Sequence, residues 1–263
     1  MRHVINILSI IILLLGLSLL ITFSGRYIIP GANIRDLAVF YLYTTFNPWL
    51  EKLTVNSPEA VTAIVWDYRG LDTLFETAVF YLALIAGLAL ARGSIFRAII
   101  SHGGHGLSLI VKTVTKITSP MIITVGAAIA LHGHLTPGGG FQGGATTAVV
   151  PMILIVVFSI IFLLERGVSK ENMLVLRSIG LIGIGITAIA LYLFGIVVGS
   201  RAFVFQNMAK PLSNIAFPAH IRGILISGTL WFFNLFEFVA VAAGFTLAFM
   251  ILIMAEERGE TNE

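Results

Sequence analysis

The sequence opens with a run of apolar residues, 4–23, that contains no charged side chain. A helix of roughly 20 residues crosses the hydrocarbon core of a bilayer, which is about 30 Å thick. Similar runs follow at 71–91, 117–132, 141–164, 174–198 and 224–255. The chain has 57% apolar and 11% charged residues, whereas a soluble protein has about 25% charged residues. The sequence therefore predicts an all-α polytopic membrane protein with about six transmembrane helices.

The first run follows Arg2 and His3, as the core of a signal peptide would. It exceeds the roughly 7–15 apolar residues of a signal peptide, and no A-x-A cleavage site follows it. We therefore expect a retained span. Residues 24–69 contain three prolines and several aromatic residues, a pattern that predicts a long connecting loop with short helical pieces.

Six spans place both termini on the same side of the membrane. If that side is the cytoplasm, cytoplasmic segments hold nine Lys and Arg residues against seven outside, so the positive-inside rule favours cytoplasmic termini in a cell-membrane protein. The cytoplasmic set would be Arg2, Arg92, Arg97, Lys112, Lys116, Arg166, Lys170, Arg177 and Arg258.

A basic segment without acids, 92–116, separates two parts of the chain. It predicts a two-span N-terminal unit with a long loop, 1–100, and a four-span unit, 101–263. No internal repeat supports a self-sufficient transporter of the inverted-repeat kind. The absence of cysteine excludes disulfides, thiolate metal sites and iron–sulfur clusters within this chain.

The strongest local signal is the segment 132–144, HGHLTPGGGFQGG. Pro137 and the five glycines that follow it predict a break in helical structure near the membrane boundary. Such backbone is tolerated there only if protein or a water-filled cavity surrounds it. The segment is then either a tight turn between closely packed helices or a turn that faces an ion or proton path. It lacks the lysine and hydroxyl of a phosphate-binding loop.

The two histidines of this segment, His132 and His134, lie two residues apart, so a helix would point them in different directions. This spacing disfavours a metal site, and nothing in the sequence indicates a haem site or another cofactor. Two interpretations remain: interfacial histidines that hydrogen-bond the turn, or a titratable relay that changes charge near neutral pH.

Three acids in or near predicted spans are candidate ion- or proton-path residues, because ionisable groups in the hydrocarbon are costly. Glu237 lies mid-span, and Asn234, three residues earlier, is expected to hydrogen-bond it. Asp72 and Glu76 share a helix face, where two carboxyl groups tend to keep a proton between them. The alternatives are a protonated Glu237 that joins two helices, and neutralisation of the acid pair by Arg69 or another subunit.

Small residues on the fifth predicted span, Gly180, Gly183 and Thr187, form a narrow stripe. Such stripes allow two transmembrane helices to approach closely. We expect a helix contact here rather than a chemical role.

The segment 132–144 resembles the signature of the MnhB/MrpB family, small membrane subunits of Mrp-type cation/proton antiporters whose module recurs in membrane-bound hydrogenases and sulfur-reducing complexes. Residues 65–76, VWDYRGLDTLFE, resemble a D-[FY]-R-G-x-D-T-x-x-E segment. This segment ends the large A subunit of antiporters and forms a separate, MbhE-like subunit in hydrogenase-type complexes. Here the two parts are joined. The residues that match are Arg69, Asp72, Glu76, Pro137, Gly138, Gly139, Gly140, Phe141, Gln142, Gly143 and Gly144.

The resemblance implies a structural and ion-path role within a large assembly and no enzyme active site in this chain. We expect a subunit of a module that exchanges Na⁺ or another monovalent cation for protons. Its partners would be A/D-type antiporter subunits, small C-, E-, F- and G-type subunits and membrane lipid, with no nucleic acid. The alternative is a structural scaffold in the membrane arm of a redox-driven pump of the membrane-bound hydrogenase or sulfane reductase type.

Overall fold

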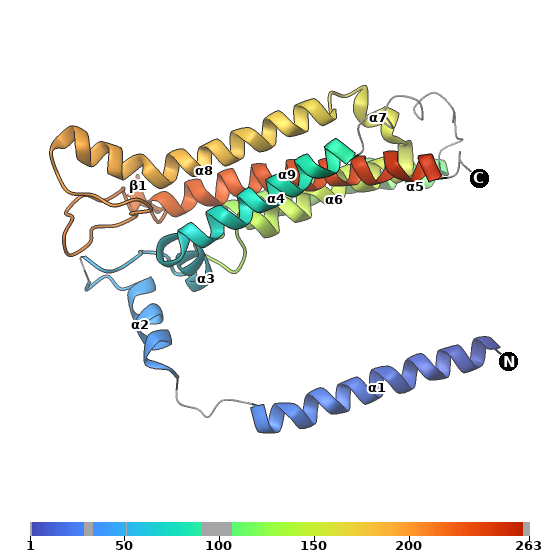
Figure 1. Ribbon diagram of the computed structural model, residues 1–263, viewed down its shortest axis with the longest axis horizontal. Coiled ribbons are helices and arrows are strands. Elements are labelled where there is room, and N and C mark those ends of the chain that lie inside the picture. Colours follow the sequence, from blue (N-terminus) through green and yellow to red (C-terminus); the bar gives the residue numbers. More distant parts are fainter. Residues whose placement is uncertain (1, 29–33, 51, 91–106, 260–263) are drawn as a thin grey trace. The chain divides into compact units, whose positions relative to one another are not determined.

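The computed structural model describes residues 2–28, 34–50, 52–90 and 107–259. Helices account for nearly all of the regular structure in these ranges (Figure 1). The elements are α1 (Arg2–Ile28), α2 (Asp36–Thr45), α3 (Ala60–Ala63), the π-helix η1 (Ile64–Tyr68), α4 (Gly70–Leu90), α5 (Leu109–Leu131), α6 (Gly140–Phe158), α7 (Ile160–Leu164), α8 (Lys170–Val198), β1 (His220–Ile221), β2 (Ile224–Leu225) and α9 (Thr229–Gly259).

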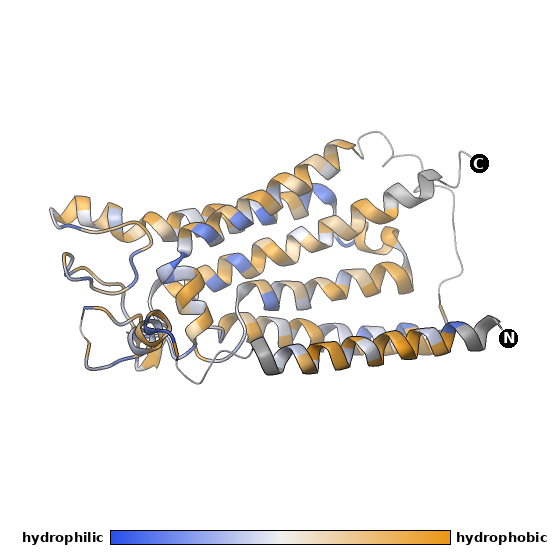
Figure 2. Cartoon of the chain, turned by 60° about the horizontal axis from the view of Figure 1, so that its bottom comes forward, coloured by the Kyte–Doolittle hydropathy of each residue, from blue (hydrophilic) through white to orange (hydrophobic). Residues whose placement is uncertain are grey.

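Six of the described helices are long and apolar enough to cross a membrane, which confirms the prediction of an all-α polytopic protein. These segments are Asn6–Gly25, Gly70–Leu90, Leu109–Leu131, Gly140–Phe158, Lys170–Val198 and Thr229–Ile253. Hydrophobic residues cover these helices along their length (Figure 2).

The chain divides into two units, Met1–Phe40 and Tyr41–Glu263. The first unit contains α1, and none of the most apolar stretch of α1 is buried within the chain. The second unit is a helical bundle that contains every candidate site residue.

Helix α9 lies at the centre of this bundle and contacts α8, α6, α5, α4 and η1. Figure 1 shows α4, α6, α8 and α9 running alongside one another. At one end, the ring of Trp66 in η1 stacks on Phe233 of α9 with 4.4 Å between ring centroids. Because lipid is as apolar as these side chains, close packing rather than apolar burial holds such helices together.

The small-residue stripe on α8 packs against α9. A Cβ on Gly180 would lie 2.8 Å from the Cβ of Ala240, and one on Gly183 would collide with the ring of Phe236. The hydroxyl of Thr187 donates within its own helix to the carbonyl of Gly183, at 2.7 Å. The expected close helix contact is therefore present.

Helix α5 begins at Leu109, capped by Ser108, so the third span is entered as a helix through Lys112 and Lys116, as we expect from the snorkelling of their side chains. Two other expected span boundaries are wrong. The fourth span is split into α6 and α7 at Ser159, which has a φ of 92°. The last span begins at Thr229, because residues 220–225 form a hairpin that pairs His220 with Leu225.

The orientation count also changes. We expected Arg177 in a cytoplasmic segment, but it lies inside α8 and is 1% exposed. Without it, eight predicted cytoplasmic Lys and Arg residues stand against seven outside, so cytoplasmic termini stay a prediction. The proposed domain boundary near residue 100 falls outside the described residues.

Candidate functional site

The glycine-rich segment is a compact turn followed directly by a helix. Gly138 and Gly139 have φ values of 156° and 140°, and the N–H of Gly139 donates to the carbonyl of Ile129 at 3.3 Å. Helix α6 then begins at Gly140. The expected break is thus correct for 132–139 and wrong for 140–144.

The helical glycines allow α6 to approach its neighbours closely. A Cβ on Gly140 would lie 2.7 Å from the Cβ of Glu237 and would collide with the carbonyl oxygen of Asn234. One on Gly143 would lie 2.7 Å from the Cβ of Ala130 in α5. Both α5 and α9 therefore pack against the first turns of α6. Phe141 and Gln142 are exposed in the same turns, and so is Pro137 in the preceding turn.

Glu237 lies in α9 at the point where α6 begins. Its side chain is buried, with the residue 8% exposed. The carboxyl group interacts with the backbone N–H of Phe141, in the first turn of α6, and lies beside the indole of Trp66. The amino end of a helix stabilises negative charge. Within the described part of the bundle, Glu237 thus lies where an ionised carboxylate finds N–H donors.

Asn234 does not hydrogen-bond Glu237 through its amide nitrogen, contrary to our expectation. Its Nδ2 is buried and has no hydrogen-bond partner among the described residues. The side chain turns instead toward the glycine turn, where Nδ2 lies 3.0 Å from the position of a Cβ on Gly133. The buried Nε1 of Trp66 likewise makes no hydrogen bond of standard geometry.

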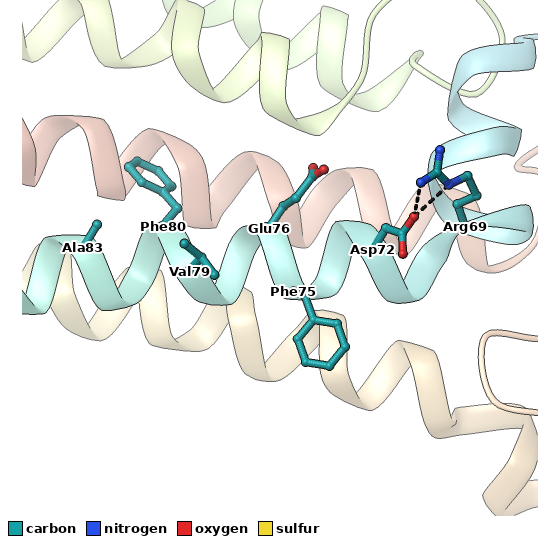
Figure 3. Close-up of a pocket in the computed structure, with 7 residues that line it drawn as sticks. All are labelled: Arg69, Asp72, Phe75, Glu76, Val79, Phe80 and Ala83. Carbon is teal, nitrogen blue, oxygen red and sulfur yellow. Dashed lines mark hydrogen bonds and ion pairs between the residues drawn. The ribbon is translucent and has the colours of Figure 1, made fainter.

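The two acids of α4 have different surroundings. Asp72 forms an ion pair with Arg69, whose Nε donates to Oδ2 at 2.7 Å, and both side chains are at least half exposed. Figure 3 shows the Glu76 carboxylate standing apart from this ion pair. Asp72 is therefore neutralised by Arg69 rather than paired with Glu76. Glu76 is exposed within the chain but close enough to Glu237 for electrostatic repulsion.

These α4 residues line an open groove of about 690 Å³ along the outer side of the helix. The charged side chains Arg69, Asp72 and Glu76 lie toward one end of it, and Val79, Phe80 and Ala83 lie toward the other (Figure 3). Figure 3 also shows that the groove follows the helix for several turns.

The two histidines of the glycine-rich segment also differ in their exposure and hydrogen bonds. His132 is exposed, with Nδ1 3.0 Å from the carbonyl of Ala128. His134 is buried, its Nε2 donates to the carbonyl of Leu225 at 2.9 Å, and its own carbonyl accepts from Ser57 Oγ at 2.8 Å. Burial lowers the pKa of His134. His134 therefore ties the turn to the hairpin.

Sequence reasoning missed Arg177. Its Nη1 donates to the carbonyl of Ala240 in α9 at 2.7 Å, and Nη2 donates to that of Thr77 in α4 at 3.3 Å. The guanidinium lies over the ring of Phe80, 4.2 Å from its centroid. Its position inside an apolar run was the available signal, because a buried cation in a membrane is costly.

A second missed feature is the ion pair of Asp67 and Lys210. The ammonium of Lys210 lies 2.8 Å from Oδ2 of Asp67, whose side chain is 1% exposed. Burial raises the pKa of Asp67, although Lys210 and the backbone N–H of Asn207 act in the opposite direction. The pair joins η1 to the connection between α8 and α9. Among the described residues, no three His, Asp or Glu side chains converge to hold a metal ion.

Curated proteins similar to this chain include the following two. One is an uncharacterized protein of Methanocaldococcus jannaschii, 25% identical over 255 residues, which are 90% of this chain and 87% of that protein. The other is the B-type component of a Na⁺/H⁺ antiporter of Bacillus subtilis, 30% identical over 87 residues. That match covers 33% of this chain and 59% of the Bacillus protein.

Solved structures that share the fold include chains of two membrane complexes. A chain of the membrane-bound sulfane sulfur reductase, an archaeal respiratory membrane complex, is 25% identical with a TM-score of 0.60, and the match covers 95% of this chain and 96% of that one. A chain of the Mrp complex from Dietzia sp. DQ12-45-1b also has a TM-score of 0.60, at 19% identity over 93% of this chain. This second match spans about a quarter of the Mrp chain, 26%.

The profile of a domain related to the MnhB subunit of the Na⁺/H⁺ antiporter matches residues 110–247. This is more than half of the chain, and it includes the glycine-rich turn, Arg177 and Glu237. The chain therefore belongs to the MnhB family, the B-type membrane subunits of Mrp antiporters and related complexes.

Proposed function

We propose that this MnhB-like subunit carries part of the proton path of its complex, in a module that exchanges Na⁺ or another monovalent cation for protons. The observation that carries the proposal is the buried carboxyl group of Glu237, held at the amino end of α6 and within electrostatic reach of Glu76. Placing such a group at the centre of a transmembrane helix costs about 2.5–3.5 kcal/mol on insertion scales. A carboxyl group kept there despite this cost indicates a functional role.

The outer face of α4 supports an assembled state. Glu76 is exposed within the chain about 9 Å along a membrane-spanning helix, at a rise of 1.5 Å per residue. A carboxylate at that depth is unstable against lipid. We infer that another membrane subunit, of the A/D type or the small C, E, F or G types, covers the α4 groove. Glu76 then lies at the junction of two subunits.

The remaining expected site residues have supporting roles in this proposal. Asp72 with Arg69 marks the aqueous end of α4, and His134 with the 132–139 turn positions the start of α6 beside Glu237. His132, exposed at the end of α5, is proposed as a secondary relay. Both termini are proposed to be cytoplasmic, and no catalytic centre is proposed within this chain.

The second candidate is a scaffold subunit in the membrane arm of a redox-driven pump, whose active site would lie in other subunits. The sulfane sulfur reductase match favours it, because that match covers nearly all of both chains. In that case the acids fix helix positions and carry no ion.

Glu237→Gln separates the two candidates. The whole complex is placed in everted membrane vesicles, and cation-dependent proton movement is followed with a ΔpH-sensitive dye. We expect the variant complex to assemble and to lose at least about 90% of the proton movement, because glutamine binds no transferable proton. The matched control is Glu165→Gln, an exposed acid after α7. Full activity of assembled Glu237→Gln would favour the scaffold.

A further inference from the structure

One segment of the second unit has polar side chains inside and apolar side chains outside. It comprises residues 42–50 and 52–54, between the end of α2 and the start of α3, and is called the inverted segment below. Its buried side chains are polar: Thr44, Thr45, Asn47 and Thr54. Its large exposed hydrophobic side chains are Leu42, Tyr43, Phe46, Trp49 and Leu53, with Trp49 90% exposed. A segment that faces water shows the opposite pattern.

The inverted segment is fixed to the rest of the bundle. The hydroxyl of Thr44, 1% exposed, lies 2.6 Å from the hydroxyl of Tyr68 in η1. The ring of Tyr41 stacks on that of Tyr68 with 4.8 Å between the ring centroids. The N–H of Val55 donates to the carbonyl of Thr44 at 2.9 Å. Trp49 is therefore displayed by an anchored turn.

The turn that carries Trp49 pairs its backbone N–H groups internally. The N–H of Asn47 donates to Oγ1 of Thr54 at 3.0 Å, and the N–H of Trp49 donates to Oδ1 of Asn47 at 3.1 Å. The N–H of Leu50 donates to the carbonyl of Asn47 at 3.1 Å, and Pro48 has no N–H to pair. Backbone donors without partners are costly in lipid. A turn with paired donors is therefore suited to lie partly within the bilayer, where water is scarce.

The inverted segment also lies where a membrane span begins. Its contact residue Tyr68 is two positions before Gly70, the first residue of α4 and of a candidate span. The exposed ion pair of Arg69 and Asp72 supplies the charges expected at the aqueous end of that span. Tyrosine and tryptophan are enriched at such boundaries, because one part of each ring is apolar and the other is polar. The inverted segment therefore continues the lipid-facing surface of the spans into the headgroup region.

The charge in the inverted segment favours lipid over a protein partner. Lys52 is exposed three residues after Trp49. Lysine is depleted in protein–protein interfaces, where its ammonium group would have to lose its water. At a membrane surface, the lysine stem lies along apolar groups while the ammonium reaches lipid phosphate.

We propose that the inverted segment is a membrane-surface anchor, which inserts Tyr43, Phe46 and Trp49 into the boundary between headgroups and acyl chains. Lys52 contacts lipid phosphate. Through Tyr68, the anchor fixes the depth at which α4 enters the membrane. This function is additional to the proposed proton path and does not depend on it.

The test attaches a nitroxide spin label to Trp49→Cys in the whole complex, reconstituted in vesicles of phosphatidylcholine and phosphatidylglycerol. The natural chain has no cysteine, and the unsubstituted complex, treated in the same way, gives the background from other subunits. Collisions of the label are measured with O₂, which partitions into lipid, and with a nickel chelate, which stays in water. We expect a ratio of O₂ to nickel collisions between those of lipids labelled on the headgroup and along the acyl chain. Lys52→Cys should give a ratio nearer that of the headgroup label.

Two other outcomes would overturn the inference. Few collisions with either reagent would mean that protein covers the turn, and the ratio of a nitroxide in water would mean that the turn lies in solution.

A second comparison uses the label at Lys52→Cys to separate anchoring from folding. Adding Trp49→Ala should move the collision ratio toward the value in water, whereas Trp49→Tyr, which keeps an interfacial ring, should preserve the ratio. The matched control is Val197→Ala, which truncates a similarly exposed side chain at the end of α8 and should change nothing. An unchanged ratio in Trp49→Ala would contradict the anchor, because the exposed ring of Trp49 would then have no part in holding the turn at the membrane.

Discussion

Gly180→Ala tests the contact between α8 and α9 that positions Arg177. A Cβ at this position would lie 2.7 Å from the carbonyl oxygen of Phe236 and 2.8 Å from the backbone nitrogen of Ala240. Ordinary contact begins near 3.4 Å, so the helices must separate by about 0.7 Å. Overpacking of this kind costs about 1–3 kcal/mol, whereas alanine gains about 0.5–1 kcal/mol over glycine within a helix. The net expectation is a loss of up to about 2.5 kcal/mol, with a central value of about 1 kcal/mol.

Gly185→Ala is the matched control, because it lies on the same helix with nothing within 4 Å of its Cβ position. It should keep or raise stability through helix propensity alone. The assay is the thermal midpoint of the purified complex in detergent, with transport measured in parallel. Gly180→Ala should lower both, since the same separation lengthens the 2.7 Å bond from Arg177 to Ala240. Equal midpoints for the two variants would refute the close packing of α8 on α9.

Two further predictions concern groups outside the spans. Because the pKa of His134 is lowered on folding, the unfolded chain binds a proton more readily, and stability should fall as the pH drops below about 6.5. His134→Gln should reduce the difference between the thermal midpoints at pH 5.5 and 7.5, and an unchanged difference would contradict this. Lys210→Met leaves the Asp67 carboxylate buried without its partner, at a cost of about 3–5 kcal/mol. Since the pKa of Asp67 is raised, protonation should lessen this loss at acid pH, and Asp67→Asn/Lys210→Met should recover most of the midpoint. A double variant no more stable than Lys210→Met would contradict it.

The spans were predictable because they follow from composition and length alone. The glycines were harder, because the same residue serves a turn at 138–139 and close helix packing at 140–144. The sequence shows that no side chain covers the backbone at a glycine. It does not show whether the backbone turns there or packs against another helix. The α8 stripe was correctly interpreted because its spacing follows one face of a helix.

Arg177 escaped sequence reasoning because its surroundings come from far along the chain. It lies within the first turns of an apolar run, where we expected its side chain to extend to the headgroups. Its actual partners are carbonyls 63 and 100 residues away in sequence. The hydrogen bond expected from the spacing of Asn234 and Glu237 was wrong for a related reason. The spacing places both on one face of α9, but the glycine turn, from another part of the chain, decides where the Asn234 amide points.

The exposed carboxyl group of Glu76 is relevant to both kinds of complex in which this family occurs. Within the chain it has water or lipid on one side and the electrostatic influence of Glu237 on the other. Lipid does not stabilise it, so we propose that a neighbouring subunit covers the α4 face in either complex. In the proposed proton path, Glu76 connects Glu237 to that neighbour, whether the neighbour is driven by an ion gradient or by a redox reaction. The proposed roles of Glu237 and Glu76 depend on neither energy source, so a B-type subunit of this kind could serve in either complex.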